Sequence, residues 1–142
     1  MRAVVAFHSS EFDLSWPEED RDPNNPPLGE DCARFIFDAL SARGVSFVPP
    51  KPVQDECGWV LYADWQGMSF LLFVHWAPLR SFAGDWWVVQ VGRRSGALRA
   101  LFGHPAEDGV AGFCELLAAI LESASGVSDI RWFGREEFAK EY

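Results

Sequence analysis

The chain has 142 residues, of which 49% are hydrophobic and 15% aromatic, a size and composition that fit one globular domain with its own core. Its formal net charge is −9, and a negative field repels phosphate backbones, which argues against general nucleic-acid binding. No apolar run approaches the roughly 18 residues of a membrane span, and the start does not predict a signal peptide.

The first predicted element is a strand at Arg2–Ser9, and a long polar loop at residues 9–28 follows it. Loops of this length are uncommon in compact domains unless they have a function or are mobile. The segment 11–31 holds eight of the 21 acids and one of the 12 bases, so the rest of the chain carries a net charge of only −2. This segment is expected to attract a basic partner.

A helix is predicted from Glu30 to Arg43, because apolar residues recur there at the spacing of one helix face. Those residues are Cys32, Phe35, Ile36, Ala39 and Leu40. Gly44 is a natural residue to end this helix, and a short strand at Val45–Val48 comes before a proline-rich stretch.

Three further strands are predicted at Gly58–Trp65, Met68–Ala77 and Asp85–Gly92. Gln66 and Gly67 form a two-residue hairpin signal between the first two, and a loop at 77–84 is expected to lead to the third. Short connections predict antiparallel pairing. Because residues 70–74 are apolar on both faces, the second of these strands is predicted to be central in the sheet.

In the last third of the chain, the sequence pattern predicts a turn at residues 92–96, a second helix, a strand at Asp129–Phe133 and a short helix at Arg135–Tyr142. Pro105 suits the first position of the second helix, and Gly126 is expected to end it. The order β-α-β-β-β-β-α-β predicts an α+β domain, with two main helices packed on a mostly antiparallel sheet of five to six strands.

The sequence contains no phosphate-binding glycine loop, nucleophile elbow or zinc-ligand spacing, so no catalytic residue, metal or cofactor is predicted. Asp20-x-Asp22-x-Asn24, with Asp31 at the twelfth position, is similar to a calcium loop, but the sixth position is Asn25 instead of Gly. The three histidines stand alone, without metal-ligand spacing. The odd number of cysteines, with Cys32 and Cys114 on apolar helix stripes, indicates a reducing and therefore cytoplasmic environment.

Seven tryptophans are the other unusual feature. Alternation along the strand places Trp59 and Trp65 on one face, and it places the adjacent Trp86 and Trp87 on opposite faces. Two helices are enough to cover one face of a sheet of this size, but not both faces. The tryptophans therefore fit either ordinary core packing or an open aromatic face that binds a partner.

Two segments resemble parts of small bacterial α/β proteins to which no activity is assigned. In Pro52–Trp59, a proline, an acidic pair and Gly-Trp open a strand, and Ile130-Arg131-Trp132 closes the chain in a similar way. Cys57 stands where those proteins have an aromatic residue. The resemblance implies a bacterial origin and supplies no activity.

The leading functional hypothesis is a non-enzymatic protein-binding module, of an immunity, inhibitor or adaptor type, that engages a basic protein. Its contact residues would be Trp16, Glu18, Glu19, Asp20 and Asp22.

The alternative is a small-molecule-binding protein or enzyme with a pocket of sheet aromatics, where the polar groups would be Cys57, His75, Arg93 and Arg94. A structural homodimer through an open sheet face is a third hypothesis.

Overall fold

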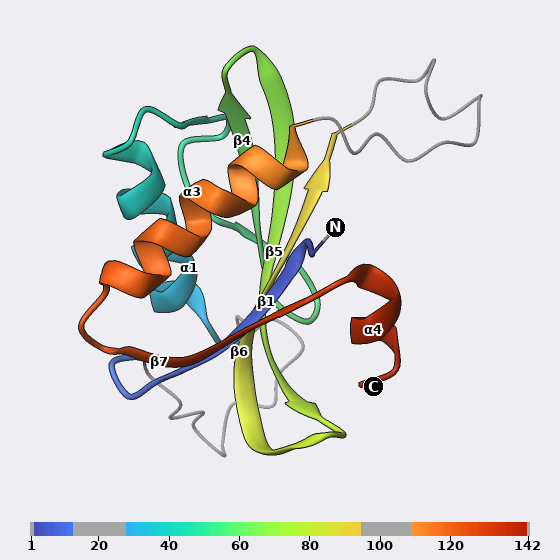
Figure 1. Ribbon diagram of the computed structural model, residues 1–142. Coiled ribbons are helices and arrows are strands. Elements are labelled where there is room, and N and C mark those ends of the chain that lie inside the picture. The colour runs from blue at the N-terminus through green and yellow to red at the C-terminus, as the bar shows by residue number, and fades with distance from the viewer. Residues whose placement is uncertain (1, 13–27, 95–108, 142) are drawn as a thin grey trace.

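The computed structural model describes residues 2–12, 28–94 and 109–141, and these form an α+β domain with a seven-stranded antiparallel sheet (Figure 1). The strands are β1 (Val4–Ser9), β2 (Ser46–Phe47), β3 (Val53–Gln54), β4 (Trp59–Trp65), β5 (Met68–Leu79), β6 (Phe82–Arg93) and β7 (Val127–Phe133). The helices are α1 (Glu30–Ser41), α3 (Val110–Ser123) and α4 (Arg135–Ala139). The strand order is β2-β4-β5-β6-β1-β7, and β3 also pairs with β4. The predicted fold class is confirmed.

The centre of the sheet is built by two successive hairpins. β4 and β5 meet at Gln66 and Gly67, so the predicted two-residue hairpin is confirmed. The φ angles of these residues, 51° and 76°, are those of a type I′ turn. β5 and β6 pair from Phe70 to Leu79 of β5, and the chain turns at residues 80–81. The predicted loop at 77–84 is therefore wrong: Pro78 lies within β5, at the point where the register shifts.

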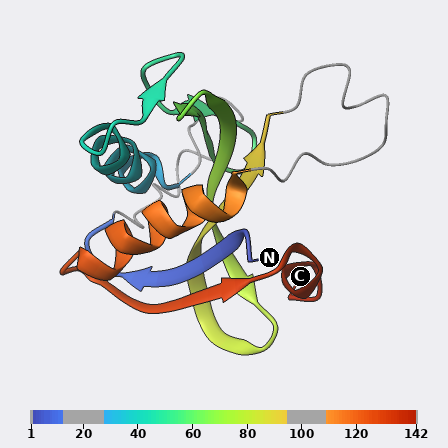
Figure 2. The same ribbon diagram turned by 45° about the horizontal axis from the view of Figure 1, so that its top comes forward.

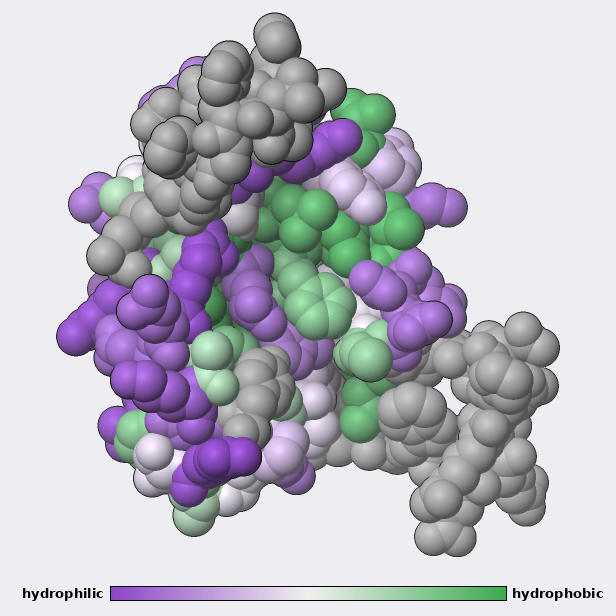
Figure 3. Space-filling view, turned by 90° about the vertical axis from the view of Figure 1, so that its right-hand side faces the viewer, coloured by the Kyte–Doolittle hydropathy of each residue, from purple (hydrophilic) through white to green (hydrophobic). Residues whose placement is uncertain are grey.

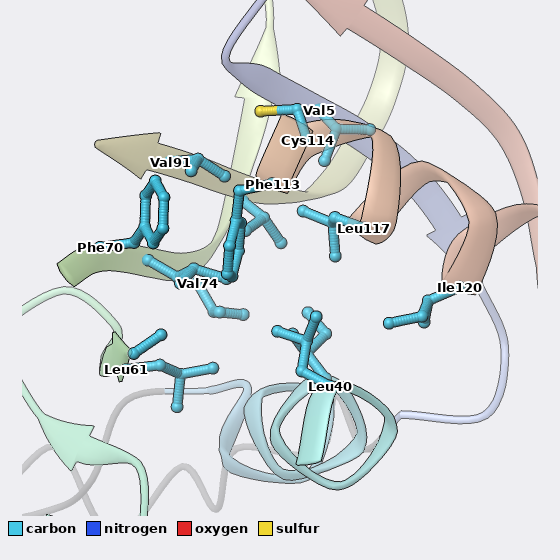
Figure 4. Close-up of a cluster of buried hydrophobic side chains, with 14 of the residues drawn as sticks. Val5, Leu40, Leu61, Phe70, Val74, Val91, Phe113, Cys114, Leu117 and Ile120 are labelled. Carbon is cyan, nitrogen blue, oxygen red and sulfur yellow. The ribbon is translucent and has the colours of Figure 1, made fainter. Parts of the chain in front are cut away.

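Helices α1 and α3 lie side by side on one face of the sheet, which we call the helical face (Figure 2). Their apolar stripes and the inward residues of the strands make the main core. Figure 4 shows its centre, where Phe113 of α3 stacks on Phe70 of β5 with ring centroids 4.6 Å apart. The predicted start of the second helix at Pro105 lies outside the described residues, and the helix ends at Ser123, before Gly126.

The opposite face of the sheet carries a smaller core under α4, built from Val4, Ala6, Ala77, Leu79, Trp86, Val88, Phe133 and Phe138. The residues after α4 are tied to the β5–β6 turn: the backbone N–H of Ser81 donates to the carboxylate of Glu141 at 2.8 Å, and that of Arg80 donates to its carbonyl at 3.0 Å. The short terminal helix therefore covers only one part of this face.

The tryptophans of the sheet are mainly core residues. Trp59 and Trp87 are buried on the helical face, and Trp86 is buried on the opposite face, so the predicted alternation is confirmed. Trp65, Trp76 and Trp132 are half-buried.

In the described part of the chain, no helix is long and apolar enough to cross a membrane.

Candidate functional site: the open half of the sheet

The candidate site lies on the opposite face of the sheet, the one away from α1 and α3, in the part that α4 leaves uncovered. Its floor comes from alternate residues of three neighbouring strands, Tyr62 of β4, Leu71 and Phe73 of β5, and Gln90 of β6, all of them half-buried. Figure 3 shows hydrophobic residues gathered in the middle of this side of the molecule, with hydrophilic ones around them. We call this surface, together with His75 and Arg94, the open half.

His75 marks the border between the open half and the part under α4. Its ring stacks on Phe73, with centroids 4.7 Å apart and planes inclined by 21°, and it meets the edge of Phe138 from α4. The side chain is 6% exposed, and this burial lowers the pKa of the imidazole from 6.5 to about 4. The ring is therefore neutral at pH 7, and its Nε2, 3.1 Å from Nε2 of Gln90, can accept a hydrogen bond from that amide.

Two arginines flank the aromatic floor. The guanidinium of Arg94, just beyond β6, lies 4.9 Å from the ring centroid of Tyr62, and its backbone N–H donates to Ser69 at 2.9 Å. The Nη2 of Arg135, at the start of α4, donates to the carbonyl of Val91 at 2.7 Å, and this guanidinium lies over Gly92. An anionic group placed on this floor would thus find a cation on two sides.

An acidic side chain limits the open half at the β4–β5 turn. Asp64 lies on the same face as Tyr62, and its carboxylate accepts a hydrogen bond of 2.5 Å from the hydroxyl of Ser69. Ser69 is also the backbone partner of Arg94, so Asp64, Ser69 and Arg94 lie in one row across the three strands. This end of the floor therefore presents an acidic group on β4 and a basic group beyond β6.

The pocket predicted from the sequence is only partly assembled. His75 and Arg94 share the open half, but Arg93 turns to the helical face, where its guanidinium lies 5.8 Å from the ring centroid of Phe70. β6 continues through Arg93, so adjacent residues point to opposite faces and the expected charged turn does not bring the two arginines together. Cys57 is exposed in the bend before β4.

The predicted acidic contact residues, Trp16, Glu18, Glu19, Asp20 and Asp22, lie outside the described residues. The described acids of the same segment, Glu11, Glu30 and Asp31, are exposed. The last two occupy the first turn of α1, where negative side chains complement the helix dipole.

Sequence reasoning missed a cluster around Trp86. This residue lies on the opposite face of the sheet, toward the β5–β6 turn and away from the open half. The ring of His8 stacks on Trp86 at 3.7 Å, and its Nδ1 lies 3.1 Å from a carboxylate oxygen of Asp129. The guanidinium of Arg131 lies 4.3 Å from the ring centroid of Phe82. Only the pairing of β1 with both β6 and β7 brings these residues together, and no local pattern in the sequence announces that pairing.

Sequence reasoning also missed a groove of about 500 Å³ between α3 and β7. Its lining is Arg2, Ala111, Cys114, Glu115, Ala118 and Trp132. Cys114 was predicted to be a core residue and is buried; Figure 4 places it at the margin of the main core. Helix periodicity assigns Cys114 to a buried stripe, but it cannot tell whether the neighbouring strand closes over that stripe.

Comparison with known proteins finds no family model, no curated protein and no solved structure that matches the chain. Among the described residues, no group of three or more His, Cys, Asp or Glu side chains is arranged to hold a metal ion.

Proposed function

We propose that the chain is a non-enzymatic protein-binding module, and that its open half takes a partner segment combining acidic with aromatic or apolar side chains. The observation that carries this proposal is the placement of Arg94 and Arg135 beside the half-buried ring of Phe73, on the face that the two main helices leave uncovered. The proposal joins the two sequence hypotheses, because it combines a protein partner with the sheet aromatics.

The chemistry of the open half supports a partner of this kind. Aromatic and arginine side chains supply much of the binding energy in protein interfaces, and Arg94 is already held in place by the ring of Tyr62. A guanidinium that stacks on a ring keeps its N–H edge for a carboxylate. The floor is a broad sheet surface, which suits a protein segment better than an enclosed small molecule.

The acidic segment 11–31 supports a second contact, with a basic region of the same partner. Its described acids, Glu11, Glu30 and Asp31, are exposed, so this segment presents negative charge in addition to the arginines of the open half. Two contacts of opposite sign would fix the orientation of the partner. They would also make association fast and sensitive to salt.

A display selection tests the open half without knowledge of the natural partner. Random twelve-residue peptides are selected on the immobilised chain, and the enriched peptides are measured by calorimetry. The expected peptides combine Asp or Glu with an aromatic residue. Arg94→Glu and Phe73→Ser should each weaken them at least tenfold, whereas Arg43→Glu, which changes an exposed arginine just after α1, should leave the Kd within twofold.

Three outcomes would overturn the proposal. The selection could enrich no peptides, or the enriched peptides could bind the Phe73→Ser variant as tightly as the original chain. Anilinonaphthalene sulfonate could also bind with a low-micromolar Kd in the absence of any peptide binder, and this result would instead favour a small anionic aromatic ligand. Circular dichroism spectra of the variants establish that each is folded.

A further inference from the structure

The sequence of β5 is that of a strand covered on both faces. Residues 70–74 are apolar without interruption, and such runs are typical of strands that lie between two layers. The residues of this run that point to the helical face are fully buried, whereas Leu71 and Phe73 are only half-buried on the opposite face. In the described part of the chain, the core under α4 includes neither of them. The second layer over this strand is therefore incomplete there.

An exposed valine extends the open half beyond β4. Val48 directly follows β2, and its backbone N–H donates to the carbonyl of Tyr62 at 3.2 Å. The residue before it, Phe47, packs on Phe37 of α1 on the helical face, so alternation turns Val48 to the same face as Tyr62. Among the described residues, Val48 is the one large hydrophobic side chain that is exposed, with an exposed fraction of 68%. The apolar surface therefore reaches the outer side of the sheet.

Val48 completes a row of residues that crosses the strands, which we call the cross-strand strip. Tyr62 pairs with Leu71, and Leu71 pairs with Gly92, so the strip runs from the end of β2 over β4 and β5 to β6. Since neighbouring strands lie about 4.8 Å apart, the strip is roughly 14 Å long. Along β5 the half-buried apolar residues are Leu71 and Phe73, two positions about 7 Å apart. The apolar surface is therefore longest across the strands.

A helix fits such a strip better than an extended segment. Side chains on one face of a helix recur with each turn, about every 5.4 Å, which is close to the roughly 4.8 Å between neighbouring strands. Side chains on one face of an extended segment recur about every 6.7 Å and lose register with the strands. Helices are also the usual cover of a sheet face, as α1 and α3 show on the helical face.

The strip ends at a cation on the β6 side. Gly92 has no side chain, and Nη2 of Arg135 lies over it, 3.9 Å from the position that a Cβ would occupy. One N–H of Arg135 donates to the carbonyl of Val91, and a guanidinium carries five such donors. Arg94 flanks the strip where it lies against Tyr62. An acidic residue at the β6 end of an occupant would therefore meet Arg135.

We infer that the partner segment is an amphipathic helix that crosses the strands and completes the second layer beside α4. Its apolar side chains at positions i, i+4 and i+7 lie over Val48, Tyr62 and Leu71, and an Asp or Glu at i+11 pairs with Arg135. Eleven residues of helix span about 16 Å, which matches the strip and its cation. The negative end of the helix dipole then also faces Arg135. This inference rests on the proposed function, because it specifies the form of the segment that the open half takes.

Two peptide libraries distinguish a helix from an extended segment. The helical library has a frame of Ala, Gln and Lys and varies positions i, i+4, i+7 and i+11. The alternating library has a frame of Thr, Gln and Lys and varies positions i, i+2, i+4 and i+6. Each varied position is drawn from Leu, Phe, Ser, Asp and Glu. Selection on the immobilised chain should enrich the helical library alone, with apolar residues at the first three varied positions and an acid at the fourth.

Double-mutant cycles place the bound helix on the strip. Val48→Ser should weaken an enriched peptide about fivefold, and it should cost nothing further once position i of the peptide is Ala. Arg135→Gln should couple in the same way to the acid at i+11, and Arg135→Lys, which keeps the charge, should weaken binding less. Gln54→Ser is the matched control for Val48→Ser, because Gln54 is exposed on the same side of β4 but pairs with Trp59 of the helical face. It should leave the Kd within twofold.

Failure of the inference can be told from failure of the proposed function. If the alternating library is enriched and its peptides lose binding with Phe73→Ser, the open half takes a partner segment, but the helix is wrong. If helical peptides are enriched and Val48→Ser leaves their Kd within twofold, the helix does not lie on the strip, and the inference is overturned as well. If neither library nor the random twelve-residue peptides yield a binder, the proposed function fails and the inference fails with it. Val48 is exposed, so its variant is expected to fold, and circular dichroism checks each variant.

Discussion

The side-chain amide of Gln90 on β6 lies 3.1 Å from Nε2 of His75 on β5, in a place where the imidazole ring is almost fully buried. An amide N–H can donate to this nitrogen only while the ring is neutral. Protonation of His75 would replace that hydrogen bond with a repulsive contact between two donors, and it would place a positive charge between the rings of Phe73 and Phe138.

The first prediction is a loss of stability in mild acid that depends on His75. The folded protein resists protonation until about pH 4, whereas the unfolded chain takes up the proton near the ordinary pKa of 6.5. Because the unfolded state binds more protons between these values, the free energy of unfolding should fall from pH 6.5 to 4, by about 2–3 kcal/mol.

Urea denaturation of the original chain and of His75→Gln, at a series of pH values from 7 to 4, measures this effect. The stability difference between the two proteins should shrink as the pH falls. Parallel curves for the original chain and His75→Gln would contradict the prediction.

The second prediction contrasts two glycines. A Cβ on Gly58 would lie 2.9 Å from Cε2 of Phe73, 3.0 Å from Cβ of His75, and closer still to the carbonyl oxygen of Val74. Gly58→Ala should therefore destabilise the protein by about 1–3 kcal/mol. Gly112→Ala is the matched control: it lies within α3 with room for a methyl group, so it should stabilise the protein by up to about 1 kcal/mol. Thermal unfolding that ranks the variants in the opposite order would disprove the packing described for Gly58.

The third prediction concerns the type I′ turn between β4 and β5. Gln66 adopts a left-handed φ of 51°, which is unfavourable for Gln and better tolerated by Asn. Gln66→Asn should raise the free energy of unfolding by about 0.5–1 kcal/mol. Gln66→Val should lower it, because a β-branched residue suits this region least. An Asn variant that is less stable than the original chain would show that the turn has another geometry.

The fourth prediction is that only one thiol is reactive in the native protein. Cys57 is exposed, whereas Cys32 and Cys114 are buried. Burial, reinforced by the negative charge of Asp31, raises the pKa of Cys32 well above 9.0 and keeps it as the unreactive thiol. Ellman's reagent at pH 8 should titrate one thiol rapidly and all three after unfolding, and Cys57→Ser should remove the fast phase. Rapid reaction of a second thiol would contradict the burial of the helix cysteines.

Features with a local signal could be predicted from the sequence. The stripe of α1 and the turn at Gln66-Gly67 depend on residues a few positions apart, and both are confirmed. The β5–β6 turn could not be predicted, because Pro78 and Gly84 indicate a loop when they are seen in isolation. Pro78 is accommodated in a strand only because it is exposed at a register shift. β3 was missed for a similar reason, since its two residues follow a run of prolines.

The candidate site could be predicted only in part. Alternation showed that Trp86 and Trp87 point to opposite faces, but the cover that buries Trp86 comes from residues near both ends of the chain. That His75 and Arg94 share a face depends on the pairing register of β5 and β6, which a sequence read strand by strand does not contain.

The pairing of β1 has a consequence for how the chain acquires its structure. Val4 pairs with Gln90 on one side and with Phe133 on the other, so both neighbours of the first strand are distant in the sequence. Such non-local pairing closes large loops, and it places folding in the millisecond-to-second range typical of β-rich domains. During synthesis, the apolar residues of β1 must leave the ribosome long before their partners exist. The nascent chain is therefore expected to depend on chaperones or on rapid completion of synthesis to avoid aggregation.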